Sequence, residues 1–221
     1  MDNSTIRQNI TYSEKEKMIL LLPMKTGTIH ATFIFQHFDF ITEHYELKTN
    51  KVLDKLDSVI HHHCMNIPQR YEDYSIICTA RNPYSRLVSA YNNSRIITEI
   101  NKPSDENFKN HFSKKKIDTG YQSDNGFPYG RDSFLYNETP KYFLRVESLY
   151  HDYIQIPFIR NSKLNKSGVL YELCNRKIHT TPTKRKPLKE YYTQDMADFV
   201  YDKFKSYFDL LGYDKDSWKY E

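Results

Sequence analysis

The chain has 221 residues, of which 38% are hydrophobic and 15% aromatic, and it carries a formal net charge of +4. This length suits one α/β domain, and 19 Tyr and 13 Phe supply enough apolar burial to exclude a disordered chain. Three widely spaced cysteines exclude a disulfide framework and indicate a reducing compartment. The mild positive charge fits an anionic ligand but is too small to indicate nucleic acid.

The N-terminal residues 1–17 are polar and are expected to form a loosely held arm ahead of a single domain over 18–221. Met18–Leu22 is a continuous apolar run, which is typical of a central parallel strand buried on both faces. This run is too short for a signal-peptide core or a membrane span, so we expect a soluble cytoplasmic protein.

A loop with Lys25, Thr26, Gly27 and Thr28 follows this strand and leads into an apolar helix expected around Ile29–Thr42. The loop offers backbone N–H groups, a helix dipole, hydroxyls and one ammonium to a phosphate. The Walker A pattern is not met, because no glycine precedes Lys25 at the required spacing. The alternative interpretation is an ordinary strand–turn–helix corner.

A histidine tract over residues 61–63 precedes the next strand. Adjacent residues of a strand point to opposite faces, and no acidic or Cys partners stand at ligand spacing, so the tract does not indicate a metal site. Either His61 or His63 could face a site and act as a base near neutral pH. A solvated turn is the alternative.

Ser75–Ala80 is a short apolar strand, after which Asn82 and Pro83 are good starting residues for a helix. Arg81 is therefore expected at the carboxyl end of a strand, with Ser89 about two turns into the helix. A guanidinium fork and a hydroxyl aimed at one point suit a terminal phosphate. A surface arginine and a helix-packing serine are the alternative.

The remaining chain supplies a third strand, basic segments and a terminal helix. Lys141–Val146 has the apolar character of a strand, and an amphipathic helix is expected after Thr193. The run Lys114–Lys116 is basic, and Lys184 and Arg185 lie in a basic loop bracketed by prolines, where they can reach an anion.

Two of these segments, LLPMKTGT and TARNPYSRLVSAY, together resemble the PAPS-dependent sulfotransferases, especially the branch that acts on carbohydrates. The pattern Leu144–Asp152 is also similar to that family. The resemblance implies a P-loop-like, three-layer α/β fold with a central, mainly parallel sheet flanked by helices. It further implies that Lys25–Thr28 cradle the 5′-phosphosulfate, while Arg81 and Ser89 hold the 3′-phosphate.

The first segment departs from the family pattern at two places. Met24 intervenes between Pro23 and Lys25, and Ile29 and His30 replace a hydroxyl residue and its neighbour. One hydroxyl contact to phosphate is therefore absent, and we expect backbone N–H groups and Lys25 to carry most of the contact.

The resemblance implies transfer of a sulfuryl group from PAPS to an acceptor hydroxyl, expected to belong to a glycan, with no metal required. His61 or His63 is favoured as the base, with His30 and Glu43 in reserve. Because no membrane anchor precedes the domain, we expect a soluble enzyme of microbial or viral origin.

Two other functions stay open. One is a P-loop-type kinase of a small metabolite, which would need the Walker A loop that this sequence lacks. The other is a non-enzymatic module that binds a polyanion or a glycan through Lys114–Lys116 and Lys184–Lys186. In the sulfotransferase interpretation, Lys184 and Arg185 instead join the cofactor contacts.

Overall fold

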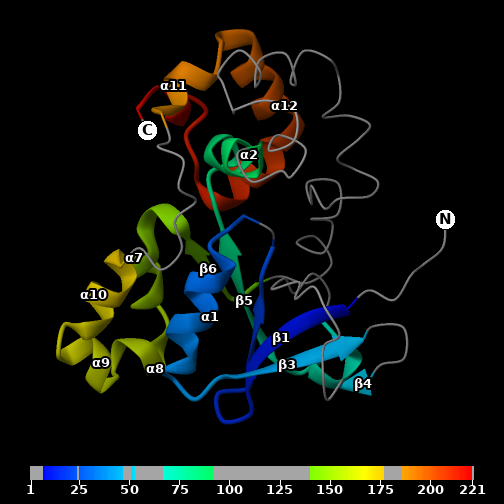
Figure 1. Ribbon diagram of the computed structural model, residues 1–221, viewed down its shortest axis with the longest axis vertical. Coiled ribbons are helices and arrows are strands. Elements are labelled where there is room, and N and C mark those ends of the chain that lie inside the picture. The colour runs from blue at the N-terminus through cyan, green and yellow to red at the C-terminus, as the bar shows by residue number, and fades with distance from the viewer. Residues whose placement is uncertain are drawn as a thin grey trace, which may run out of the picture. The chain divides into compact units, whose positions relative to one another are not determined.

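The computed structural model describes residues 7–23, 25–46, 51–52, 67–91, 140–176 and 186–220 (Figure 1). These residues fall into two compact units. The first unit holds the described residues up to Ala80 together with 140–176, and the second holds 81–91 with 186–220.

The first unit is built on a six-stranded sheet in the order β4-β3-β1-β2-β5-β6 (Figure 1). Its strands are β1 (Arg7–Ser13), β2 (Met18–Leu21), β3 (Ile41–Glu46), β4 (Lys51–Val52), β5 (Ser75–Ala80) and β6 (Tyr142–Arg145). The pairs β2–β5 and β5–β6 are parallel, and the other three pairs are antiparallel. The α/β class is therefore confirmed, but the prediction of a mainly parallel sheet is wrong because the sheet is mixed.

The antiparallel half of the sheet is centred on β1. This strand contains polar residues, so its sequence does not show the apolar pattern of a buried strand. Asn9 and Thr11 are buried, with exposed fractions of 6% and 0%. Across the β1–β3 pair, the hydroxyls of Thr11 and Thr42 lie 3.0 Å apart, and Asn9 Oδ1 lies 2.7 Å from Nδ1 of His44. Such cross-strand hydrogen bonds satisfy buried polar groups, so a polar segment can occupy the middle of a sheet. The predicted loose arm thus includes an internal strand.

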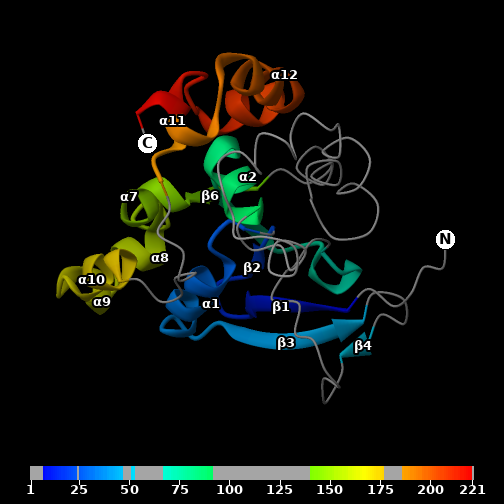
Figure 2. The same cartoon turned by 45° about the horizontal axis from the view of Figure 1, so that its top comes forward.

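The helices of the first unit follow β2 and β6 (Figure 2). They are α1 (Thr28–Gln36), α7 (Leu149–Tyr153), α8 (Pro157–Arg160), α9 (Lys163–Lys166) and α10 (Val169–Asn175), with short 3-10 turns η1 (Gln69–Tyr71) and η3 (Val146–Ser148). The ring of Phe35 on α1 lies 5.4 Å from that of Tyr153 on α7, so the two helical segments share one core. The helix expected to reach Thr42 ends at Gln36, and β3 begins at Ile41.

The corner between β6 and α7 is held by Asp152, which is buried. Its carboxylate accepts hydrogen bonds from the Arg145 guanidinium at 2.7 Å and 3.1 Å and from the Arg145 backbone N–H at 2.7 Å. The Ser148 hydroxyl donates a further bond at 2.9 Å. The Arg-x-Glu-x-Leu-x-x-Asp pattern of the sequence therefore builds a charge-assisted brace at the end of β6.

We expect Asp152→Ala to lower the free energy of unfolding by about 2–3 kcal/mol, because four hydrogen bonds lose their buried acceptor. Glu14→Ala is the matched control, since its ion pair with Lys17 in the same unit is exposed. Urea titration followed by circular dichroism measures both variants. An effect of Asp152→Ala no larger than that of Glu14→Ala would show that the brace does not stabilise the fold.

The described part of the second unit is helical, and aromatic residues of its helices pack against one another. Its elements are α2 (Pro83–Tyr91), α11 (Leu188–Tyr191), α12 (Gln194–Leu211) and the 3-10 turn η4 (Ser217–Lys219). The Tyr84 hydroxyl donates to the Lys215 carbonyl at 2.8 Å, and the Tyr192 hydroxyl donates to the Tyr84 carbonyl at 2.9 Å. The Thr193 side chain caps α12 and Gly212 ends it at a φ of 70°, which confirms the predicted terminal helix.

None of the helices in the described part of the chain is both long and apolar enough to cross a membrane.

Candidate functional site

The loop between β2 and α1 has an unusual backbone. Lys25 has a φ of 63° and Gly27 a φ of 77°, while Thr26 between them is not in the positive-φ region. A non-glycine residue in the left-handed region costs roughly 1–2 kcal/mol, and such residues cluster at functional sites. The alternating sign of φ is the pattern by which successive N–H groups form an anion-binding concavity. The backbone therefore supports the predicted anion site at this loop.

The same loop starts α1 without a side-chain cap. Gly27 is the N-cap residue, and the first turn of α1 contains no acidic residue. Uncapped N–H groups at the positive end of a helix dipole favour a bound anion. A Cβ at Gly27 would lie 3.1 Å from Cγ2 of Val146, so this loop packs closely against the residue that follows β6.

Thr26 has a different role from the one the sequence predicted for its hydroxyl. Its side chain is buried, and the hydroxyl donates to the Pro23 carbonyl at 2.5 Å. The Thr79 hydroxyl of β5 lies 2.6 Å from the same oxygen. Because the Thr26 proton is committed to Pro23, Thr79 must be the donor in this second bond. The Thr26 side chain thus ties the loop to β5, and only its backbone can serve an anion.

Sequence reasoning missed Thr79 because its partner lies 53 residues away along the chain. The available signal was a hydroxyl residue near the carboxyl end of an otherwise apolar strand. Lys25 is partly exposed, whereas Thr28, the first residue of α1, is buried. The four predicted residues, Lys25–Thr28, are consecutive in this turn, and Lys25 is the charged residue among them.

Arg81 and Ser89 belong to the second unit. The Asn82 side chain accepts a hydrogen bond from the Tyr84 N–H at 3.0 Å, which confirms it as the cap of α2. Nε of Arg81 donates to the Ser85 hydroxyl at 2.8 Å, which fixes the guanidinium beside the first turn of this helix. Ser89 is buried within α2, with an exposed fraction of 3%.

The favoured bases His61 and His63 lie outside the described residues, as do Lys184 and Arg185. The basic run 114–116 lies outside them too.

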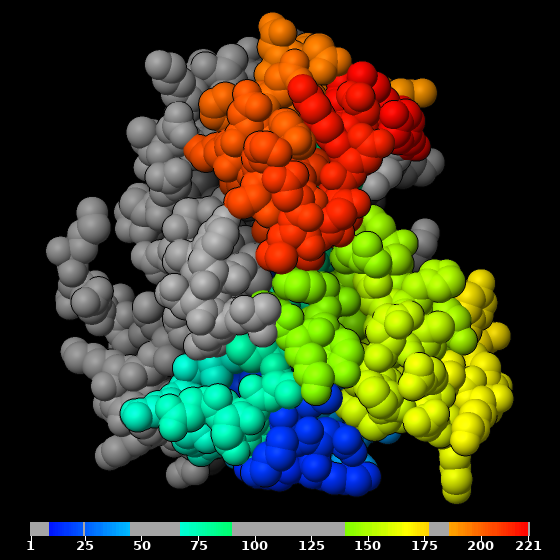
Figure 3. Space-filling view, turned by 180° about the vertical axis from the view of Figure 1, so that it is seen from behind, coloured from blue at the N-terminus to red at the C-terminus, as the bar shows by residue number. Residues whose placement is uncertain are grey.

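The reserve base Glu43 belongs to a polar and aromatic cluster on β1, β3 and η1. Its carboxylate accepts from the Tyr12 hydroxyl at 2.7 Å and from the Arg70 guanidinium at 2.5 Å. The rings of Tyr12 and Tyr71 lie 4.8 Å apart in the same cluster. Figure 3 shows the η1 segment (turquoise) beside the β1–β2 hairpin (blue). Glu43 is thus occupied by bonds that join β3 to η1.

The second reserve base, His30, joins α1 to α10. Its Nε2 lies 3.0 Å from the Leu173 carbonyl, and because a carbonyl only accepts, Nε2 carries the proton. Nδ1 is buried. Burial lowers the pKa of His30, although the hydrogen bond to the Leu173 carbonyl opposes this shift. Neither nitrogen is placed to take a proton from an acceptor, so the geometry favours a structural role.

The lowered pKa of His30 predicts a pH-dependent stability. The unfolded chain binds the proton more readily, so this residue's contribution is present above its ordinary pKa of 6.5 and is lost as pH falls through the lower folded pKa. His30→Gln keeps a donor for Leu173 but does not titrate. Denaturant midpoints between pH 7.5 and 5 should fall less in His30→Gln than in the wild type, and parallel curves would contradict this account.

Comparison with protein-family models, curated proteins and solved structures finds no match to this chain.

Proposed function

We propose that the chain is a PAPS-dependent sulfotransferase. It transfers a sulfuryl group from PAPS to an acceptor hydroxyl, and the proposed acceptor is a glycan. The observation that carries this proposal is the β2–α1 loop. It places a lysine at positive φ and a glycine N-cap within one turn. Each of these features favours a phosphate-like anion. They lie in the same segment that resembles the loop with which the sulfotransferases bind the phosphosulfate.

In this proposal the loop binds the 5′ end of the donor. The backbone N–H groups from Lys25 to Thr28 hold the phosphosulfate, and the Lys25 ammonium neutralises charge that grows on the bridging oxygen as the S–O bond breaks. A preorganised group of this kind typically contributes about 3–4 kcal/mol to lowering the barrier. The tie between Thr26 and Thr79 keeps the loop in one geometry.

Arg81 and Ser89 hold the 3′-phosphate in this proposal. Their support is the eight-residue spacing in the sequence and the well-formed start of α2. Arg81 follows directly on Ala80, the last residue of β5. A guanidinium presents several donors to a phosphate, which suits tight recognition of the nucleotide.

The reaction moves one group and one proton. The acceptor oxygen forms a bond to sulfur while the bond between sulfur and the bridging phosphate oxygen breaks, so that PAP leaves. The acceptor proton passes to a base, for which His61 or His63 is proposed. Such a base typically contributes about 10²–10⁴-fold to the rate.

A thermal-shift comparison tests the proposal against its two rivals. PAP should raise the melting temperature of the full chain, whereas Mg-ATP should not. Stabilisation by Mg-ATP alone would favour the kinase, and salt-sensitive heparin binding that PAP does not displace would favour a polyanion-binding module. A labelled-PAPS assay over a panel of glycan acceptors, a lipid alcohol and a tyrosine peptide then tests the transfer itself.

A further inference from the structure

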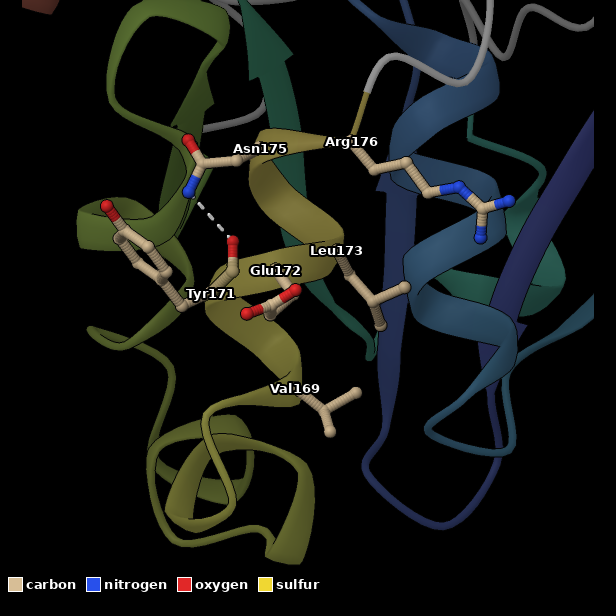
Figure 4. Close-up of a pocket in the computed structure, with 6 residues that line it drawn as sticks. All are labelled: Val169, Tyr171, Glu172, Leu173, Asn175 and Arg176. Atoms are coloured by element: carbon tan, nitrogen blue, oxygen red, sulfur yellow. Dashed lines mark hydrogen bonds between the residues drawn. The ribbon is translucent and has the colours of Figure 1, made fainter.

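A hollow of about 620 Å³ lies along α10 in the first unit. The described residues that line it are Val169, Tyr171, Glu172, Leu173, Asn175 and Arg176 (Figure 4). This volume falls within the range of roughly 300–1,000 Å³ that is usual for small-ligand sites. Val169 and Tyr171 are 42% and 56% exposed, which is high for large apolar side chains. The hollow therefore offers both apolar surface and several polar groups to a ligand.

Arg176 is the cationic group of this hollow. It stands four residues after Glu172, a spacing that normally allows an ion pair on a helix surface. Arg176 lies beyond the end of α10, however, with a φ of −72° and a ψ of 127°. Figure 4 shows its side chain directed toward α1 and away from Glu172. No carboxylate among the described residues forms an ion pair with Arg176, so its charge is available to a ligand.

The hollow is linked by one hydrogen bond to α1, the helix that follows the Lys25–Thr28 loop. Leu173 lines the hollow, and its carbonyl accepts the hydrogen bond from His30. His30 stands three residues after Gly27, which is about 4.5 Å along a helix axis. Leu173 and Val169 extend from α10 on the side that faces α1 (Figure 4). A ligand in the hollow would therefore lie beside the first turn of α1.

We propose that this hollow is an acceptor subsite and that it binds an acidic sugar of an oligosaccharide. This inference rests on the proposed sulfotransferase function. Arg176 pairs with the carboxylate or sulfate of the sugar, as a guanidinium fork matches a planar or tetrahedral anion. The apolar Leu173 and Val169 contact the carbon face of the ring, and the Glu172 carboxylate binds ring hydroxyls.

The test uses the full chain, a glucuronate-containing tetrasaccharide and the same tetrasaccharide with its carboxyl groups reduced. Isothermal titration should show that Arg176→Gln weakens binding of the acidic sugar about tenfold or more, in line with loss of a charged hydrogen bond. The matched control is Lys163→Gln on α9, which removes another exposed cation outside the hollow and should change the affinity less than twofold. The reduced sugar should bind weakly and equally to the wild type and both variants.

The inference is overturned if Arg176→Gln and Lys163→Gln weaken binding equally, since that indicates general attraction to polyanions. Competition by single-stranded DNA of equal charge, or an undiminished affinity in Arg176→Gln, would overturn it as well. PAP affinity is measured on the same samples and should be equal in the wild type and in Arg176→Gln. If PAP does not bind while Arg176 governs sugar binding, the sulfotransferase proposal fails and the hollow remains a sugar site without the acceptor role.

Discussion

Lys25→Gly is expected to lower kcat for sulfuryl transfer by about 10²–10³-fold without loss of stability. The rate falls because the ammonium that stabilises the leaving phosphate is removed. The fold is spared because Lys25 adopts a φ of 63°, a conformation that glycine reaches with no steric penalty. Relief of strain and the greater freedom of glycine in the unfolded chain nearly cancel, so the free energy of unfolding should stay within about 1 kcal/mol.

The matched control for Lys25→Gly is Asp39→Gly. Asp39 has a φ of 60° in the exposed turn after α1, so the same backbone change occurs away from the loop. Single-turnover kinetics with PAPS and urea titration are measured on both variants. Asp39→Gly should retain full activity. A kcat for Lys25→Gly within threefold of the wild type would remove Lys25 from the chemical step.

Gly27→Ala is expected to weaken PAP binding at least tenfold and to lower the free energy of unfolding by about 2–3 kcal/mol. The added methyl group imposes a strained φ of 77° and brings Cβ within 3.1 Å of Val146 Cγ2. The neighbouring backbone must shift, and the N–H groups that start α1 shift with it. The substitution therefore disturbs both the proposed anion site and the packing of the loop against Val146.

Two further variants separate these causes. Gly168→Ala imposes the same kind of strain at a φ of 80° but meets no atom within 4 Å, so it should cost about 1–2 kcal/mol and leave PAP binding unchanged. The pair Gly27→Ala with Val146→Ala should recover part of the lost PAP affinity, because the close contact is relieved. Equal PAP affinity in Gly27→Ala and Gly168→Ala would contradict a binding role for this loop.

Local patterns in the sequence were enough to predict the elements around the proposed site. The apolar runs beginning at Met18 and Ser75 form β2 and β5, and Asn82 caps α2 as its residue type indicates. Burial of a strand is visible as a run of apolar residues, and a helix cap is visible in the residue type at one position. Both signals come from residues that are close together in the sequence.

The antiparallel half of the sheet could not be predicted in this way. Asn9 and Thr11 are polar, and they are tolerated inside the sheet only because residues of β3, more than 30 positions away, satisfy them. The role of Thr26 depends on Thr79 for the same reason. A sequence pattern shows that a hydroxyl is present, but only the folded chain decides whether it faces a ligand or a neighbouring strand.

Titration of PAP into the full chain tests the central claim most directly. The wild type should bind PAP at one site, and the double variant Arg81→Ala with Ser89→Ala should bind about 100-fold more weakly, because charged hydrogen bonds to a phosphate are lost. The double variant Arg160→Ala with Ser167→Ala changes the same residue types on exposed positions and should bind as the wild type does. No PAP binding by the folded wild type, or an affinity of the first double variant within threefold of the wild type, would contradict the assignment.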